Sequence, residues 1–205
     1  MPHAPNGTAG FVAGIAAVGL ATTACSTAPP AAAPAAAPVS APASTPSAAP
    51  LVLPAVLDVA RIDACTILTD DELRPVTGAI DKRKPTNPAG GPACLISPAD
   101  LSRPSVSVLL YPHIGPQPDR LYDSAAHYPY FARTAPISGY PAVHSAQGSD
   151  GPQTGECGTA FSASPVDEIE VYVVTTNDAD PHYTAMCTMS DQLARDVITN
   201  AAKGG

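Results

Sequence analysis

Four cysteines are the residues with the clearest chemistry in this 205-residue chain: Cys65, Cys94, Cys157 and Cys187. Zinc sites usually draw on closely spaced pairs of ligands, and the chain contains neither a C-x-x-C nor an H-x-x-x-H motif. An even number of cysteines is instead typical of disulfides in an exported domain. We therefore expect two disulfides and no metal site.

Sequence alone permits three pairings of these four cysteines. We favour Cys65 with Cys94 and Cys157 with Cys187, because each bond closes a local loop of similar size and staples one half of the domain. By loop entropy each bond would stabilise the fold by roughly 3.5 kcal/mol. This assignment leaves no free thiol in the domain for catalysis.

The remaining reactive side chains form no recognised catalytic motif. The chain lacks the G-x-S-x-G motif of a nucleophilic serine, and none of its five histidines lies in a metal or catalytic motif. An acidic trio, Asp70 to Glu72, falls in the first turn of an expected helix, where it favours capping over cation binding. We identify no catalytic residue and no cofactor. Only an acid–base pair assembled from distant residues stays open, with His113, His127 or His144 as candidates.

An aromatic stretch provides the candidate ligand-binding rim. Tyrosine combines apolar area with a polar tip, which suits a sugar or a peptide. We favour the simpler alternative, that these rings cover one end of the sheet. The candidate residues are Tyr111, His113, Tyr122, His127, Tyr128 and Tyr130.

Most elements that would position these residues are expected to be strands. Alternation predicts strands over 93–96 and 105–111, and Ser138-Gly139 predicts a hairpin between residues 133–137 and 140–146. The clearest pair is 156–163 with 168–175, joined by a turn at 164–167, because Ile169, Val171 and Val173 alternate with Glu170 and Tyr172.

Two helices are expected at the ends of the domain and a weaker one between them. Thr69 and Glu72 form a capping-box pattern before a short helix that contains Pro75 and stops at Gly78. The weaker helix covers 119–126. Asp180 as N-cap and Pro181 at the first position would start the last helix, whose apolar face contains Met186, Met189, Leu193 and Val197.

These elements together indicate an α+β fold. Strands outnumber helices and short turns join neighbouring strands, so we expect an antiparallel sheet with helices packed on one face. The formal net charge of −8, with every Lys and Arg after residue 60, makes nucleic acid an unsuitable partner.

The start of the chain has the organisation of an export signal. An apolar run at 11–21 is too short to span a bilayer but fits the h-region of a signal peptide at 1–24. Small residues lead into Cys25, as in a lipobox, although Thr22 stands where Leu is usual and the n-region has no Lys or Arg. We expect a lipid on Cys25 that anchors the protein to the outer face of the membrane; the alternative is a secreted protein with an ordinary signal peptide.

A linker would separate this anchor from the domain. Residues 25–54 contain eight of the 25 prolines and few large apolar side chains, so they are expected to be extended and disordered. As polyproline II, the 29 residues after Cys25 would reach roughly 90 Å. The folded domain is expected at 55–203.

The domain resembles a known family. "DACTILTDDEL", the second cysteine in "PAGGPACLI" and the late "CTMSDQLARDVI" are similar to the actinobacterial lipoprotein family catalogued as domain of unknown function 3558. The resemblance covers roughly 55–203. Members tend to carry an aromatic residue, often Trp, at the position of Ile96. The resemblance to this family implies an envelope lipoprotein with paired disulfides, and it supplies no catalytic residue.

The sequence therefore favours a tethered binding or interaction module. Its expected partners are the membrane, through the lipid, and a cell-wall component, a small ligand or an envelope protein. The alternatives are a small envelope hydrolase and an extracytoplasmic accessory domain of a sensor or transporter.

Overall fold

The computed structural model describes residues 51–88 and 91–204, which belong to one compact unit. The expected signal peptide, Cys25 and nearly all of the expected linker lie outside the described residues. Among the residues described, no helix combines the length and the apolar character that crossing a membrane requires.

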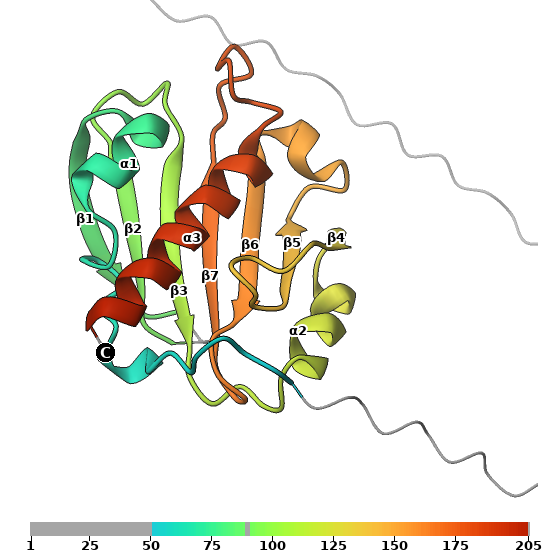
Figure 1. Cartoon of the computed structure of the whole chain (residues 1–205). Helices are drawn as coiled ribbons and strands as arrows, with labels where there is room; N and C mark the ends of the chain where they lie inside the picture. Colours follow the sequence, from blue (N-terminus) through green and yellow to red (C-terminus); the bar gives the residue numbers. More distant parts are fainter. Residues whose placement is uncertain (1–50, 89–90, 205) are drawn as a thin grey trace, which may run out of the picture. The chain divides into compact units, whose positions relative to one another are not determined.

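Seven strands form one antiparallel sheet in the order β1-β2-β3-β7-β6-β5-β4 (Figure 1). Sequence-distant β3 and β7 are neighbours, which places β7 at the centre of the sheet. The strands are β1 (Ile80–Thr86), β2 (Ala93–Pro98), β3 (Ser105–Tyr111), β4 (Tyr130–Arg133), β5 (Ala142–Ala146), β6 (Glu156–Ser162) and β7 (Glu168–Val174).

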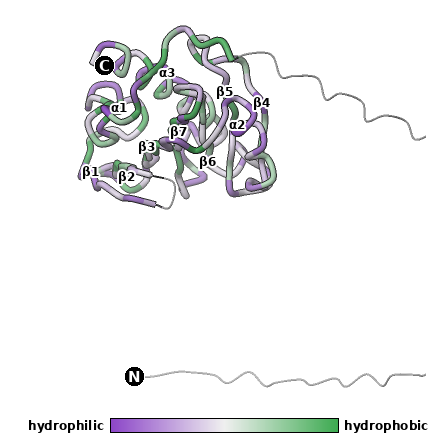
Figure 2. Tube along the Cα trace, turned by 90° about the horizontal axis from the view of Figure 1, so that it is seen from below, coloured by the Kyte–Doolittle hydropathy of each residue, from purple (hydrophilic) through white to green (hydrophobic). Residues whose placement is uncertain are grey.

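The two longer helices cover one face of this sheet. Helices α1 (Asp70–Thr77) and α3 (Met186–Gly204) lie on the same side, with α3 crossing β3, β7 and β6 (Figures 1 and 2). The short α2 (Asp119–Asp123) packs instead against the opposite face of β5 and β6. Three 3-10 turns complete the domain: η1 (Val59–Arg61), η2 (Ser124–His127) and η3 (Gly151–Thr154). The expected α+β fold is confirmed, with α2 added on the second face.

The main core lies between α3 and the central strands. Strand alternation turns one side of β3 and β7 toward the helix, and these side chains are almost fully buried against the apolar face of α3. Each such burial contributes roughly 1.5–3 kcal/mol. The residues are Val106, Val108, Leu110, Ile169, Val171 and Val173 from the strands and Met186, Leu193 and Val197 from the helix.

Both favoured disulfides are confirmed. Cys65–Cys94 links the segment before α1 to β2, and Cys157–Cys187 links β6 to α3, each with a Cα–Cα distance of 5.0 Å. Each bond therefore ties the helical layer to the sheet.

Most of the expected local structure is also confirmed. The Thr69 side chain accepts a hydrogen bond from the Glu72 amide while Glu72 accepts from the Thr69 amide, so the capping box is complete. The hairpin turns at Ser138-Gly139, where both residues have positive φ, and its outer strands are β4 and β5.

The expected start of the last helix is wrong. The helix begins at Met186, because Asp180 caps a local turn instead: its Oδ1 accepts from the His182 amide at 2.7 Å. Turn bonds from Tyr183 to Asp180 and from Ala185 to His182 continue this irregular segment. Cys187 consequently lies in the first helical turn.

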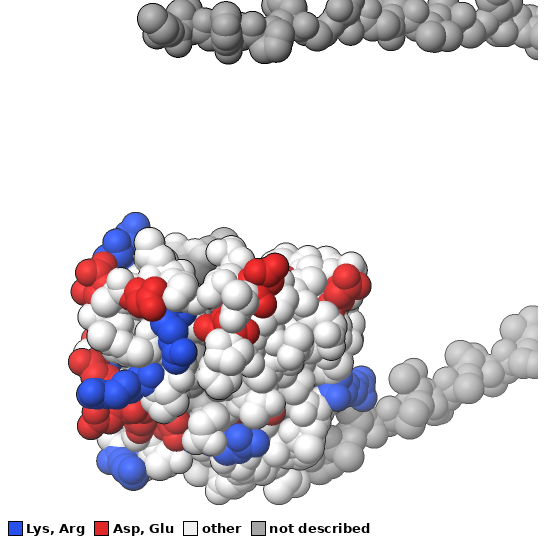
Figure 3. All heavy atoms as spheres, turned by 90° about the horizontal axis from the view of Figure 1, so that it is seen from above, with Lys and Arg blue, Asp and Glu red and all other residues white. Residues whose placement is uncertain are grey.

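Strand β1 was not expected from the sequence. Its "IDKRKPT" lacks apolar alternation, but it is an edge strand, where Lys and Pro are tolerated. Arg83 turns toward the helical side and binds the Leu68 carbonyl at 2.9 Å and Asp70 at 2.5 Å. Basic and acidic side chains are accordingly interspersed at the α1–β1 end (Figure 3).

Removing the Cys157–Cys187 bond should loosen α3 from the sheet. We expect Cys157→Ala/Cys187→Ala to lose roughly 3.5 kcal/mol of unfolding free energy, measured by urea denaturation. Cys65→Ala/Cys94→Ala is the matched comparison, because the sequence separations are 29 and 30 residues. A loss below about 1 kcal/mol in both variants would contradict the loop-entropy account.

Candidate functional site

The face of the sheet opposite α3 is covered only in part. Leu121 of α2 packs with Val143 and Ala160, flanked by Tyr122 and Phe131, and so covers the β4–β5–β6 half. The residues that follow η2 reach back toward the centre of the sheet, where Tyr128 lies beside residues of β3 and β7. The edge of this cover leaves a cleft over the central strands.

Two glutamates of the central strand lie beneath that cleft. Glu168 and Glu170 are two residues apart on β7, so both point to the face away from α3. They are only 7% and 3% exposed. In the strand register Glu170 lies between Leu109 and Ala160, neither of which can neutralise a carboxylate. Buried charge of this kind is costly unless it is paired.

Glu170 is held by hydroxyl groups. Ser145 Oγ donates to its Oε1 at 2.9 Å, and the Tyr111 hydroxyl donates to its Oε2 at 3.1 Å. A Cβ on Gly158 would collide with Glu170 Oε1 and lie 2.7 Å from Ser145 Oγ. Glycine at position 158 is therefore required for the carboxyl group to lie against the sheet.

Glu168 has fewer hydrogen-bond partners than Glu170. Its Oε2 is buried and has no hydrogen-bond partner among the described residues, and the same is true of Gln117 Nε2. Ser162, the strand partner of Glu168, donates to Gln117 Oε1 at 3.1 Å. Unsatisfied buried polar atoms are rare and call for an explanation, of which a functional site is one.

Burial changes the titration of this whole group. Burial, together with the neighbouring Glu170 carboxyl, raises the pKa of Glu168 to about 8 against the opposing effect of Arg120. Burial also raises the pKa of Glu170, although hydrogen bonds from Ser145 and Tyr111 oppose it. The pKa values of Tyr111, Tyr128 and Tyr172 are likewise raised, first by burial, so these hydroxyls stay protonated.

Two adjoining pockets open onto these residues and share Tyr111 and Tyr128. We call them together the glutamate–tyrosine cleft. The first, about 280 Å³, is lined by Ser107, Leu109, Tyr111, Tyr128, Gln147, Glu170 and Tyr172. The second, about 510 Å³, is lined by Tyr111, Pro112, Ile114, Arg120, Ser124, His127, Tyr128 and Glu168.

Another pocket, near η1 and the end of α3, is a weaker candidate for a binding site. It encloses about 310 Å³ and includes Asp58, Arg61 and Asn200 among its lining residues. Arg61 and Asp58 already pair at 3.2 Å and both are largely exposed. This ion pair is therefore solvated, unlike the buried glutamates of the cleft.

The structure brings together half of the expected rim. Tyr111, His127 and Tyr128 line the glutamate–tyrosine cleft. His113 does not: its side chain is 84% exposed beside Asp167. Tyr122 and Tyr130 also lie outside the cleft. The guanidinium carbon of Arg133 lies 3.9 Å from the centre of the Tyr122 ring, and the Tyr130 ring packs on Gly151.

The sequence interpretation missed the carboxyl groups of the cleft. Alternation along 168–175 does place Glu168, Glu170 and Tyr172 on one face, and this was the available signal. What the pattern could not indicate is that α2 and the segment after it bury that face.

His144 meets an aspartate and hydroxyl groups on the helical side. Its Nε2 lies 2.8 Å from Asp191 Oδ1, which also accepts from Thr159 Oγ1. Burial would raise the pKa of Asp191, but the bonds from His144 and Thr159 outweigh it and hold the pKa below its usual range. Ser190 is bonded to Thr159 and to the Cys187 carbonyl rather than to His144. Thr159 is the strand partner of His144, but among the described residues no hydroxyl group is hydrogen-bonded to the histidine. The arrangement joins α3 to the sheet.

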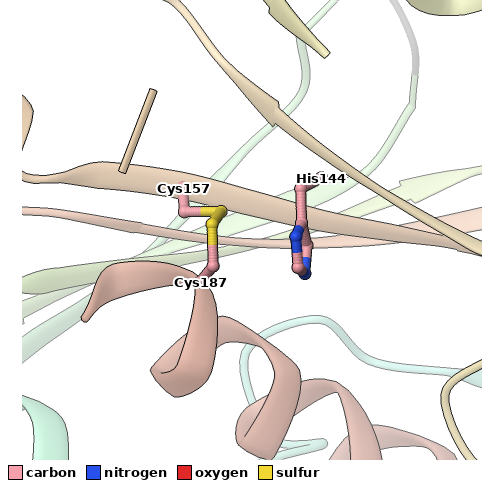
Figure 4. Close-up of side chains that lie close together, drawn as sticks. All are labelled: His144, Cys157 and Cys187. Atoms are coloured by element: carbon pink, nitrogen blue, oxygen red, sulfur yellow. A yellow bond between two sulfur atoms is a disulfide. The ribbon is translucent and has the colours of Figure 1, made fainter. Parts of the chain in front are cut away.

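The same histidine lies beside a disulfide (Figure 4). Ligand atoms of His144, Cys157 and Cys187 fall within 4.8 Å of one another, a spacing that a metal could bridge. Metal binding by cysteine requires thiolates, and these two sulfurs are bonded to each other. In the oxidised protein the cluster is therefore a covalent and polar connection between β6 and α3.

Comparison with known proteins identifies a family but no individual relative. The model of a family described as "Protein of unknown function (DUF3558)" matches residues 20–200. No curated protein and no solved structure matches the chain. The match spans the whole sheet, both disulfides and the glutamate–tyrosine cleft.

The buried glutamates should make the fold less stable in alkaline solution. The folded-state pKa of Glu168 is raised to about 8, above its ordinary value. Folding therefore costs no extra free energy below the ordinary pKa, and the free energy of unfolding falls as pH rises from there toward 8. We expect the Tm to fall by about 5–10 °C between pH 5.5 and 8.5, followed by circular dichroism.

The double variant Glu168→Gln/Glu170→Gln should remove most of this slope, since amides do not ionise. Asp81→Asn removes one charge from an exposed position of β1 and should keep the slope. An unchanged slope in the double variant would show that other groups cause it.

Proposed function

The chain belongs to the DUF3558 family, and on that premise we propose that it is a ligand-binding lipoprotein of the cell envelope. The domain would be displayed outside the membrane, tethered through a lipid on Cys25 and the Pro-rich segment that follows. The ligand would occupy the glutamate–tyrosine cleft.

One observation carries the binding function. Glu168 and Glu170 are buried in the central strand yet line pockets, and no ion pair within the described residues neutralises either one. A fold under selection for stability alone would replace such groups by apolar side chains, because buried uncompensated carboxyls cost stability. Concave sites with a few convergent polar groups are the usual form of ligand sites.

The sequence supports the location. The apolar run at 11–21, the small residues before Cys25 and the Pro-rich segment to residue 54 follow the order of a lipoprotein signal, anchor and linker. A diacylglyceryl group supplies two chains, the number that stable anchoring requires. Two disulfides are also what an oxidising compartment favours.

Binding has better support than hydrolysis. The His144–Asp191 pair has no serine on the histidine, and His113 is exposed away from the cleft. Both cleft glutamates have raised pKa values, whereas a carboxylate acid–base pair needs environments that push the two values apart. An accessory domain of a sensor or transporter would use the same cleft for binding.

Native mass spectrometry of the full chain purified from its own envelope tests the binding function. We expect a retained ligand mass on the wild type that is lost from Tyr111→Ala, because Tyr111 lines both pockets and holds Glu170. Tyr183→Ala is the matched control, since Tyr183 packs over Gly155 away from the cleft. A ligand retained equally by both variants would place binding elsewhere.

The anchor has a separate test. Cys25→Ala should move the protein from the membrane fraction to the soluble or uncleaved form and remove the lipid mass. Ser26→Ala should leave both unchanged. Membrane association without any lipid mass at residue 25 would contradict the proposed anchor.

A further inference from the structure

The smaller pocket of the glutamate–tyrosine cleft has an unusual lining. Three tyrosines, Tyr111, Tyr128 and Tyr172, surround the buried Glu170, with Leu109 on the floor. Its volume is about 280 Å³, enough for a small solute and too little for a folded segment of another protein. We call this the tyrosine pocket.

Two of the three tyrosine rings are held by hydrogen bonds from their hydroxyl groups. Tyr111 donates to Glu170, and Tyr172 donates to Glu156 on the neighbouring strand. The Tyr172 ring lies over Gly158, whose missing side chain leaves room for it. The faces of aromatic rings carry negative π-electron density, which attracts cations.

Glu170 lacks a positive charge rather than a hydrogen-bond donor. Both of its oxygens already accept from hydroxyls, and the residue forms no ion pair with any described Lys or Arg. The neighbouring carboxyl group on its own strand, Glu168, supplies no positive charge either. Arg120 lines the larger pocket with Glu168 and is not among the residues of the tyrosine pocket.

We propose that the tyrosine pocket binds a small organic ammonium ion of the quaternary, trimethylated kind, an inference that rests on the proposed binding function. A quaternary ammonium offers charge without any N–H donor, which matches a carboxylate whose oxygens are already occupied. Aromatic rings are a recognised means of holding such a cation in proteins, and a buried carboxylate adds an opposite charge. The ammonium group could belong to a free solute or to a lipid headgroup.

Choline and its uncharged carbon analogue, 3,3-dimethyl-1-butanol, make the most direct comparison. The two have nearly the same shape, so their difference reports the charge. Titration calorimetry on the full chain in a neutral detergent should show choline binding at least tenfold more tightly than the alcohol. Glycerophosphocholine then assigns the source: tighter binding than choline indicates a lipid headgroup, and weaker binding indicates a free solute.

Three substitutions in the pocket and one outside it separate the effect of charge from that of shape. Glu170→Gln keeps the shape and removes the charge, so it should weaken choline binding at least tenfold. Tyr128→Leu should weaken it by a similar factor, whereas Tyr128→Phe, which keeps the ring, should bind nearly as the wild type does. Asp81→Asn removes an exposed charge and should bind as the wild type does. A cooperative thermal transition for each variant confirms that it is folded.

The outcomes distinguish this inference from the function on which it rests. Equal binding of choline and the alcohol, or unchanged choline binding by folded Glu170→Gln, would overturn the ammonium site. The cleft would still be a binding site if a ligand mass were lost from Tyr111→Ala. Absence of choline binding together with ligand retention by that variant would overturn both.

Discussion

The alternation of side chains along β7 is the constraint on which the rest of this domain depends. As the central strand it is covered on both sides, so Ile169, Val171 and Val173 must fit under α3 while Glu168 and Glu170 are enclosed on the other face. A shift of register by one residue would place both carboxyls in the apolar core and move Val171 and Val173 to the opposite face. The polar groups of the cleft and the core of the fold are therefore fixed by the same strand pairing.

The two faces of the sheet contribute differently to stability. On the helical side, apolar packing, two disulfides and the His144–Asp191–Thr159 network all join helices or loops to strands. The opposite face has only a small apolar cluster under α2 and contains the destabilising glutamates. Functional sites commonly violate the rules of stable packing and depend on the remainder of the fold for compensation. Covalent links on the helical face provide such compensation here.

Much of this fold could be predicted because its signals are local. The capping box at Thr69, the alternation in β3 and β7, and the cysteine spacing each specify structure over short ranges. Strand β1 and the late start of α3 could not be predicted, because an edge position tolerates "IDKRKPT" and a local side-chain bond at Asp180 replaces helix capping. The cleft was harder still, since it depends on where α2 lies in space. Tyr111 and Tyr128 were identified by composition, but only the tertiary structure shows which carboxyls they cover.

No described Lys or Arg lines the tyrosine pocket, and this bears on its selectivity for a charged ligand. A carboxyl group in apolar surroundings avoids the cost of burial by staying protonated, so a neutral ligand meets a neutral pocket and gains little from charge. A cation changes this balance, because it restores the ionised form and is attracted to it across a medium of low dielectric constant. The discrimination between a cation and its neutral analogue should then grow as the site becomes drier. Burial of Glu170 beneath tyrosines, which lowers the stability of the free domain, is for this reason also what would make the site selective.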